Sequence, residues 1–148
     1  MTRRGATASS PPGFLELFQG KAGLSHWVHR VCQEHVVTHS IPNSELYFAN
    51  LGDDSMFEKL LAQARSGAFL WVHAAPPCKT FSSARRSDQW GTAKVLRTAA
   101  RPEGFGDPAA ETGNLYAKRT IAIAEVLVSI GAVFSIENPL KSLIWELN

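Results

Sequence analysis

The sequence predicts an α/β fold, with a mostly parallel sheet and helices on both of its faces. Short apolar runs alternate along the chain with segments of helical spacing, an order that is typical of parallel sheets. The runs contain few polar positions, which indicates strands that are covered on both faces. At 148 residues, the chain is long enough for one domain with a core of its own.

The first half of the chain is expected to hold three strands and two helices. Strands are predicted at 14–18, 36–41 and 46–50, and a helix is predicted at 24–31 from the spacing of its apolar residues. A second helix follows Asp53 and Asp54, because either carboxylate suits an N-cap, and it ends near Gly67.

The second half begins with a strand at 68–74 and ends with one at 133–136. A helix is expected to start at Asn114 and to end with Gly131 as the residue just beyond it. An irregular stretch, 75–113, lies between, and its glycines and prolines mark turns. A loop of this length is unusual in so small a domain and indicates a function, such as a lid or a substrate clamp.

Several protein classes are excluded by composition. Residues 1–12 predict a flexible tail, rich in Ser and Pro and without the apolar part of a secretory signal, ahead of a domain at 13–148. Cys32 and Cys78 make no disulfide framework, and no Cys and His pairs have zinc spacing, so an intracellular protein without metal is expected. The longest apolar region, 121–136, is interrupted by polar residues, which argues against a membrane span.

Positive charge gathers in one segment. Residues 79–101 contain six Lys or Arg side chains and one acid, although the net charge of the whole chain is only +2. Because Lys and Arg supply most contacts to phosphates, the segment favours a polyanionic partner such as nucleic acid. A solvated loop rich in arginine explains the charge equally well.

The clearest chemical signal lies in residues 71–82. An apolar run ends in Pro76 and Pro77, and Cys78 follows on a predicted loop, where the two prolines give a thiolate a rigid, partly exposed mount. Glu137 follows the last apolar run, where desolvation of its carboxyl group would favour proton donation. If the two strands are parallel neighbours, both side chains reach one edge of the sheet, which suggests covalent catalysis with acid assistance.

Each signal also has an ordinary structural explanation. A lone cysteine is more often a small buried residue than a nucleophile, and Glu137 could cap a helix ahead of Pro139. A third signal, Gly20 and Gly23 after the first strand, would let backbone amides approach a ligand, but the pair also suits a mere tight turn. No Lys-Ser or Lys-Thr pair follows this turn, which argues against a nucleoside triphosphate.

These three motifs resemble motifs of the cytosine-5 DNA methyltransferases. Residues 18–23 (Phe-Gln-Gly-Lys-Ala-Gly) resemble the family's first motif, Phe-x-Gly-x-Gly-Gly. Residues 76–82 (Pro-Pro-Cys-Lys-Thr-Phe-Ser) resemble its catalytic Pro-Pro-Cys-x-x-Phe-Ser motif. Residues 137–145, which begin Glu-Asn-Pro and end at a Trp, are similar to a divergent branch in algal genomes, some of it linked to mobile elements. The resemblance spans about residues 14–145.

The resemblance implies a Rossmann-like, class I fold that uses S-adenosylmethionine, with DNA as partner and a nuclear location in a eukaryote. It implies that Cys78 adds to C6 of a cytosine and that Glu137 hydrogen-bonds or protonates N3. The residues implied to line the cofactor pocket are Glu16, Phe18, Gly20, Gly23, Asn50, Asp53 and Pro76. Those implied to contact the substrate are Pro77, Phe81, Ser82, Arg85, Arg86 and Asn138, and the basic loop 79–101 would hold phosphates.

The chain departs from the family pattern in several places. Ala22 replaces the first glycine of the Gly-Gly pair, and the second strand ends without the acid that binds ribose. Asn50 stands where the family has an adenine-binding Asp, with Asp53 as the alternative. The family's Gln-x-Arg-x-Arg motif and target-recognition region would lie beyond Asn148, so C-terminal truncation is expected. Two alternatives stay open: a non-catalytic fragment that only binds cofactor or nucleic acid, and a cytosine-5 methyltransferase of RNA.

Overall fold

Strand pairing confirms the predicted parallel sheet. The computed structural model describes residues 13–20, 23–32, 37–42, 51–82 and 94–147. Its strands are β1 (Gly13–Gln19), β2 (Val37–Pro42), β3 (Phe69–Ala74) and β4 (Val133–Ile136). They lie in the order β2-β1-β3-β4, and each neighbouring pair is parallel. The strand predicted at 46–50 and the tail at 1–12 fall outside the described residues.

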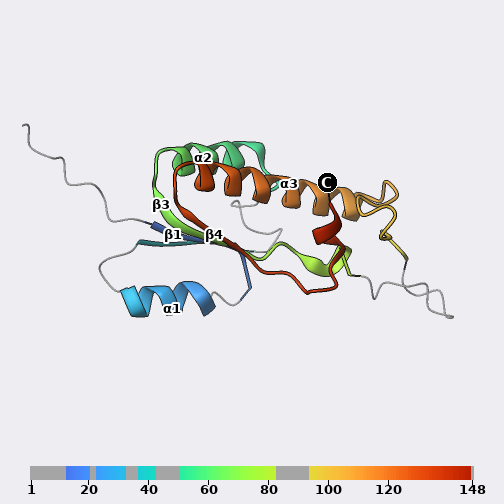
Figure 1. Cartoon of the computed structure of the whole chain (residues 1–148), viewed down its shortest axis with the longest axis horizontal. Coiled ribbons are helices and arrows are strands. Elements are labelled where there is room, and N and C mark those ends of the chain that lie inside the picture. Colours follow the sequence, from blue (N-terminus) through green and yellow to red (C-terminus); the bar gives the residue numbers. More distant parts are fainter. Residues whose placement is uncertain (1–12, 21–22, 33–36, 43–50, 83–93, 148) are drawn as a thin grey trace, which may run out of the picture.

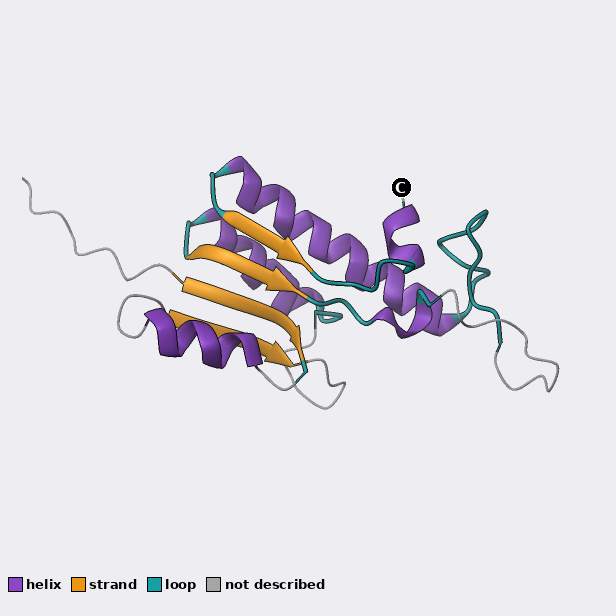
Figure 2. Ribbon diagram, turned by 60° about the horizontal axis from the view of Figure 1, so that its bottom comes forward, coloured by secondary structure: helices purple, strands orange, loops and turns teal. Residues whose placement is uncertain are grey.

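Helices cover both faces of the sheet, as predicted. They are α1 (Gly23–Cys32), α2 (Asp54–Arg65) and α3 (Pro108–Ser129). Figure 1 shows α2 and α3 on one face and α1 on the other. Helix α1 contacts β1 and β2 and lies over that half of the sheet (Figure 2). On this face Leu70 of β3 and Val133 of β4 stay about half exposed, because α1 packs mainly over β1 and β2.

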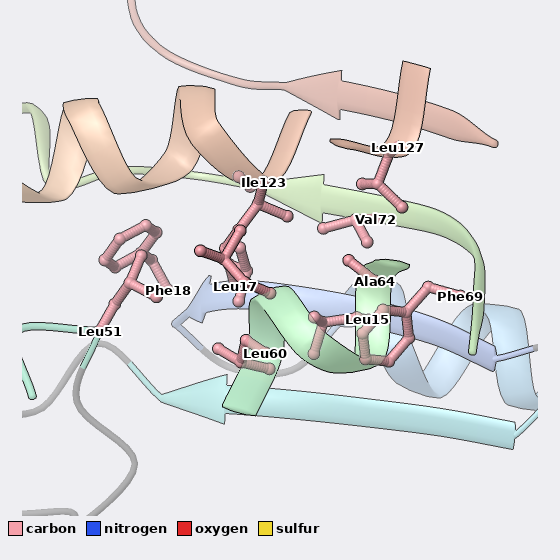
Figure 3. Packing of buried hydrophobic residues seen from close by; sticks show 12 residues of the cluster. Leu15, Leu17, Phe18, Leu51, Leu60, Ala64, Phe69, Val72, Ile123 and Leu127 are labelled. Atoms are coloured by element: carbon pink, nitrogen blue, oxygen red, sulfur yellow. The ribbon is translucent and has the colours of Figure 1, made fainter. Parts of the chain in front are cut away.

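The main core fills the space between the sheet and the layer of α2 and α3. Strand β1 is almost entirely buried, since it has a neighbour on each side and helices on both faces. Its Leu17 meets Val72 of β3, Leu60 of α2 and Ile123 of α3 in one apolar cluster (Figure 3). This cluster holds the two helices against the sheet and so fixes where the strands end.

Helix α3 starts earlier than the predicted Asn114, so the irregular stretch ends at residue 107 rather than 113. Asp107 is the N-cap, and its carboxylate accepts a hydrogen bond of 3.0 Å from the Ala109 N–H. Pro108 suits the first helical position because that residue needs no N–H partner. The prediction missed this start because it assigned Pro108, like Gly104 and Gly106, to a turn, whereas Pro108 is the first residue of the helix.

The predicted end of α3 is confirmed. Gly131 adopts a φ of 77°, a left-handed conformation that a residue with a Cβ rarely takes. Its N–H donates to the Val128 carbonyl at 3.1 Å, and the Ala132 N–H donates to the Leu127 carbonyl at 2.9 Å. This pair of bonds is a Schellman motif, which turns the chain directly into β4.

Adjacent residues of α3 provide a test of this packing. Leu127 is fully buried in the main core, whereas Val128 is 69% exposed. We expect Leu127→Ala to lower the free energy of unfolding by about 2–5 kcal/mol, because it leaves a cavity. Val128→Ala should change it by less than about 0.5 kcal/mol. Urea titrations followed by circular dichroism measure both; equal losses would contradict the described burial.

Candidate active site

Three strands end side by side, and each is followed by one of the three motifs. In the register of the sheet, Leu17 of β1 pairs with Ala74 of β3, and Ala74 pairs with Ile136 of β4. The glycine turn, the Pro-Pro-Cys segment and the Glu-Asn-Pro segment therefore leave the sheet at one edge. The sequence analysis placed Cys78 and Glu137 at one edge on the condition that β3 and β4 are parallel neighbours, and the structure meets this condition.

The Cys78 thiol lies on a rigid turn. Residues Cys78–Thr80 form a 3-10 turn, η2, directly after Pro77, and the Phe81 N–H closes it by donating to the Cys78 carbonyl at 2.9 Å. The Cys78 side chain is exposed and carries a free thiol. The Phe81 ring is fully buried against Ala117, so it supports the turn from within the protein. This corrects its predicted role as a substrate contact.

The Glu-Asn-Pro segment is bonded directly to the strand that leads to Cys78. The Glu137 N–H donates to the Ala74 carbonyl at 2.9 Å, which extends the β3–β4 pairing by one residue. The Asn138 side chain donates through Nδ2 to the Pro76 carbonyl at 2.8 Å. The Glu137 side chain itself is exposed, so the predicted desolvation of its carboxyl group is wrong. Asn138 was predicted to contact substrate, yet its amide group holds the chain two residues before Cys78.

A strained residue lies near the end of β1, where the register with β2 shifts between Leu17 and Gln19. Phe18 has a φ of 59°, which is unusual for a residue with a side chain. Its ring is buried and packs on Tyr116 of α3, with ring centroids 5.3 Å apart. Because strain of this kind persists only where packing holds it, the aromatic pair keeps the turn in its shape.

Glu16 ties the end of β1 to the start of α1. The Ser25 N–H donates to Glu16 Oε2 at 2.8 Å, and the Ser25 hydroxyl donates to the same oxygen. A carboxylate thus serves as acceptor for the first turn of the helix, where N–H groups lack partners within the helix. No described residue donates to Oε1, which leaves this oxygen for another donor.

The turn partly fits a cofactor such as S-adenosylmethionine. No described residue lies within 4 Å of a Cβ built at Gly20 or Gly23, so the described part of the chain leaves space beside both glycines. Gln19 Oε1 is buried and finds no donor among the described residues, which makes it an acceptor that a ligand could satisfy. The Asp53 carboxylate caps α2 by accepting from the Met56 N–H at 2.7 Å, and Asn50 lies outside the described residues.

The basic side chains of segment 79–101 do not all lie on the surface. Lys79 and Arg101 are exposed, as phosphate contacts require, while Arg85 and Arg86 fall outside the described residues. Arg97 is only 5% exposed, so it cannot contribute to a phosphate-binding surface. Burial lowers the pKa of its guanidinium, an effect that the charges of Glu111 and Glu103 oppose. Sequence reasoning counted Arg97 as one more surface charge; its place after the apolar Val95 and Leu96 was the available signal of burial.

The end of the irregular stretch is held by an ion pair. Lys94 donates to the Asp107 carboxylate at 2.8 Å. This bond, together with the Ala109 N–H, holds the pKa of Asp107 below its ordinary value. The stretch therefore returns to α3 at a defined point.

A cavity also lies away from this edge of the sheet. A cavity of about 320 Å³ lies at the opposite, amino ends of β1 and β3, with a wholly apolar lining that includes Trp27, Val28 and Leu70. In the described part of the chain, no three His, Cys, Asp or Glu side chains gather as metal ligands would. None of the described helices has the length and apolarity needed to cross a membrane.

Comparisons with known proteins do not extend this picture. No protein-family model, curated protein or solved structure matches the chain. The motifs, and the sheet edge at which they leave the strands, are therefore the features that bear on function.

The bond between Glu16 and Ser25 predicts a difference between two variants. Glu16→Ala removes the acceptor of two buried donors and should lower the free energy of unfolding by about 1–3 kcal/mol. Glu16→Gln keeps an oxygen at this position and should lose less than half as much. Thermal unfolding of both variants checks this; an equal loss would mean that the negative charge, and not the hydrogen bonds, stabilises the helix.

The low pKa of Asp107 predicts a pH-dependent contribution to stability. Its carboxylate is stabilised in the folded state, so the contribution is present above the pKa of the unfolded chain and is lost as pH falls through the lower, folded pKa. We expect Asp107→Asn to be less stable than the parent at neutral pH, and the difference to shrink as the pH falls below the unfolded pKa of the carboxyl group and on through its lower, folded pKa. Urea midpoints across this range measure it, and a difference that persists in acid would contradict it.

Proposed function

We propose that this chain is a catalytic methyltransferase domain that transfers a methyl group from S-adenosylmethionine to C5 of cytosine in DNA. One observation carries the proposal. The exposed Cys78 thiol and the exposed Glu137 carboxyl group follow paired parallel strands, and the open glycine turn follows the next strand in the sheet. A nucleophile, an acid and a ligand-binding turn thus share the sheet edge where α/β proteins bind ligands.

In this proposal the turn at Gly20 and Gly23 binds the cofactor. When bound, S-adenosylmethionine would supply an electrophilic methyl group. The open space beside both glycines and the unpartnered Gln19 Oε1 support binding here. Phe18, held by its contact with Tyr116, would keep the turn in the required shape before the ligand arrives.

The chemistry assigned to Cys78 and Glu137 follows from the weak reactivity of cytosine C5. The Cys78 thiolate would form a bond to C6, which makes C5 nucleophilic and moves negative charge toward N3. Glu137 would stabilise that charge through a hydrogen bond or a proton to N3. After C5 has taken the methyl group, a base removes the C5 proton, the S–C6 bond breaks, and the thiolate is restored.

Cys78 can reach C6 only if the target cytosine lies outside the base stack of the nucleic acid. A cytosine within a duplex hides C6 from the exposed Cys78, so the target base would have to be flipped into the site. The exposed Lys79 and Arg101 support a nucleic-acid partner, since both can contact phosphates. The motifs favour DNA, and RNA is an outcome that the experiment below separates.

A covalent trap tests this function. Fluorine at C5 blocks the final loss of a proton, so an active protein mixed with S-adenosylmethionine and a 5-fluorocytosine oligonucleotide stays bonded through Cys78. We expect a mass shift equal to the DNA oligonucleotide plus a methyl group, none with Cys78→Ala, and a rate reduced about 100-fold or more with Glu137→Gln.

Matched oligonucleotides and a second cysteine variant act as controls. Cys32 lies on α1, away from this edge, and Cys32→Ala should form the adduct like the parent. An adduct with RNA alone would replace DNA by RNA as the substrate. Folded protein that forms no adduct with either would overturn the catalytic proposal in favour of a domain that only binds.

A further inference from the structure

We propose that Arg97 is a positioning residue that fixes the Cys78 turn for attack on the base. The inference rests on the proposed function, but the contacts that carry it are independent of any ligand. Arg97 does not touch the thiol. It holds Thr80, at the far end of the η2 turn that begins with Cys78.

The guanidinium of Arg97 uses all of its five N–H donors. Nε donates to the Thr80 carbonyl at 3.1 Å, and Nη2 donates to the Thr80 hydroxyl at 3.5 Å and to the Ala110 carbonyl at 2.5 Å. Nη1 donates to the Pro102 carbonyl at 2.6 Å and to Asn114 Oδ1 at 2.5 Å. One side chain therefore joins the Cys78 turn, the irregular stretch and the start of α3.

Packing around this side chain leaves little freedom. Its Cζ lies 3.8 Å from the centroid of the Phe81 ring, a cation–π contact that adds to the hydrogen bonds. A Cβ built at Gly113 would stand 2.6 Å from the Thr80 hydroxyl and 2.9 Å from Arg97 Nη2. Such distances are too short for real atoms, so this glycine lets α3 approach the turn closely.

Burying the charge of Arg97 is energetically unfavourable, which indicates that this residue does more than stabilise the fold. All five acceptors are neutral oxygens, so no carboxylate directly compensates the charge that burial takes out of water. An apolar side chain would fill such a site more cheaply, because a buried charge without an ionic partner is unfavourable. What an apolar residue cannot provide is a planar fork that holds several carbonyls in one geometry.

Cys78 thus lies midway between two anchors. Asn138 holds the Pro76 carbonyl two residues before it, and Arg97 holds the Thr80 carbonyl two residues after it. The first anchor comes from the segment of Glu137, so it couples the nucleophile to the acid. The second couples the nucleophile to α3. A thiolate held on both sides keeps the orientation that attack on C6 needs, which lowers the barrier without strengthening substrate binding.

The test uses three variants that disturb this second anchor in different ways. Arg97→Met keeps much of the volume and removes all donors; Arg97→Lys keeps the charge and removes the fork; Gly113→Ala keeps Arg97 and pushes it away from Thr80. Arg119→Met is the matched control, because Arg119 is also a partly buried arginine, bonded to the Leu51 carbonyl at 2.7 Å and lying 4.7 Å from the Phe57 ring centroid.

We expect kcat for methylation to fall about 100-fold in Arg97→Met and Gly113→Ala, with KM for the oligonucleotide within about threefold of the parent. Arg97→Lys should fall as far, because a lysine cannot form the fork. Alkylation of Cys78 by iodoacetamide, located by peptide mass spectrometry, should change in rate in the same three variants. Arg119→Met should lose thermal stability without changing that rate.

Each outcome decides between two explanations. Parent-like kcat and alkylation in Arg97→Met would overturn the proposal, as would equal changes in Arg119→Met. If all three variants unfold by circular dichroism while Arg119→Met folds, Arg97 is a general structural residue and the positioning role is wrong. A parent protein that forms no 5-fluorocytosine adduct refutes the proposed function instead, and the alkylation rates then still decide whether Arg97 orients the thiol.

Discussion

The in-register parallel pairing of β1, β3 and β4 is the constraint on which the site depends. Parallel strands cannot be joined by short turns, so each returns through a helix, and motifs far apart in sequence emerge at one edge. The pairing of Ala74 with Ile136 brings the chain that carries Cys78 beside the chain that carries Glu137, although about sixty residues separate them along the sequence. A shift of one residue would turn every side chain of a strand to the other face. Burial of Val72 and Leu17 under α2 and α3 prevents that shift.

Beyond the strands, side chains rather than secondary structure determine the shape of the site. Asn138 and Arg97 each bind a backbone carbonyl near Cys78, and Phe81 anchors the same turn in a small core with Ala117. Loops can hold catalytic side chains in a fixed position only when such contacts fix the loop. An irregular backbone lacks the regular hydrogen bonds of a helix or a sheet. The side chains that hold the turn are therefore largely buried, and the Cys78 thiol and Glu137 carboxyl group are exposed.

The two faces of the sheet are stabilised by different means. Under α2 and α3 the contact is mainly apolar, with the buried Thr120 of α3 as a polar exception, whereas β3 and β4 on the opposite face carry a polar group of side chains. Ser135 Oγ accepts a hydrogen bond of 2.8 Å from the Trp71 indole and lies 2.9 Å from His73 Nδ1. These bonds link the two strands directly where no described helix covers them. The strand pair that leads to Cys78 and Glu137 thus has a second set of contacts that preserves its register.

Much of the fold was determined by local sequence. The spacing of apolar residues predicted β1, β2, β3, β4 and the three helices, and Asp53 and Gly131 marked helix ends, because capping depends on neighbouring residues alone. Motif order also indicated that Cys78 and Glu137 leave the sheet at one edge, on the condition that β3 and β4 pair in parallel. The tertiary structure alone decided which polar residues are buried. Arg97, Phe81 and Glu137 have surroundings built from segments distant in sequence, so local pattern assigned a surface role to the first two and a buried one to the third.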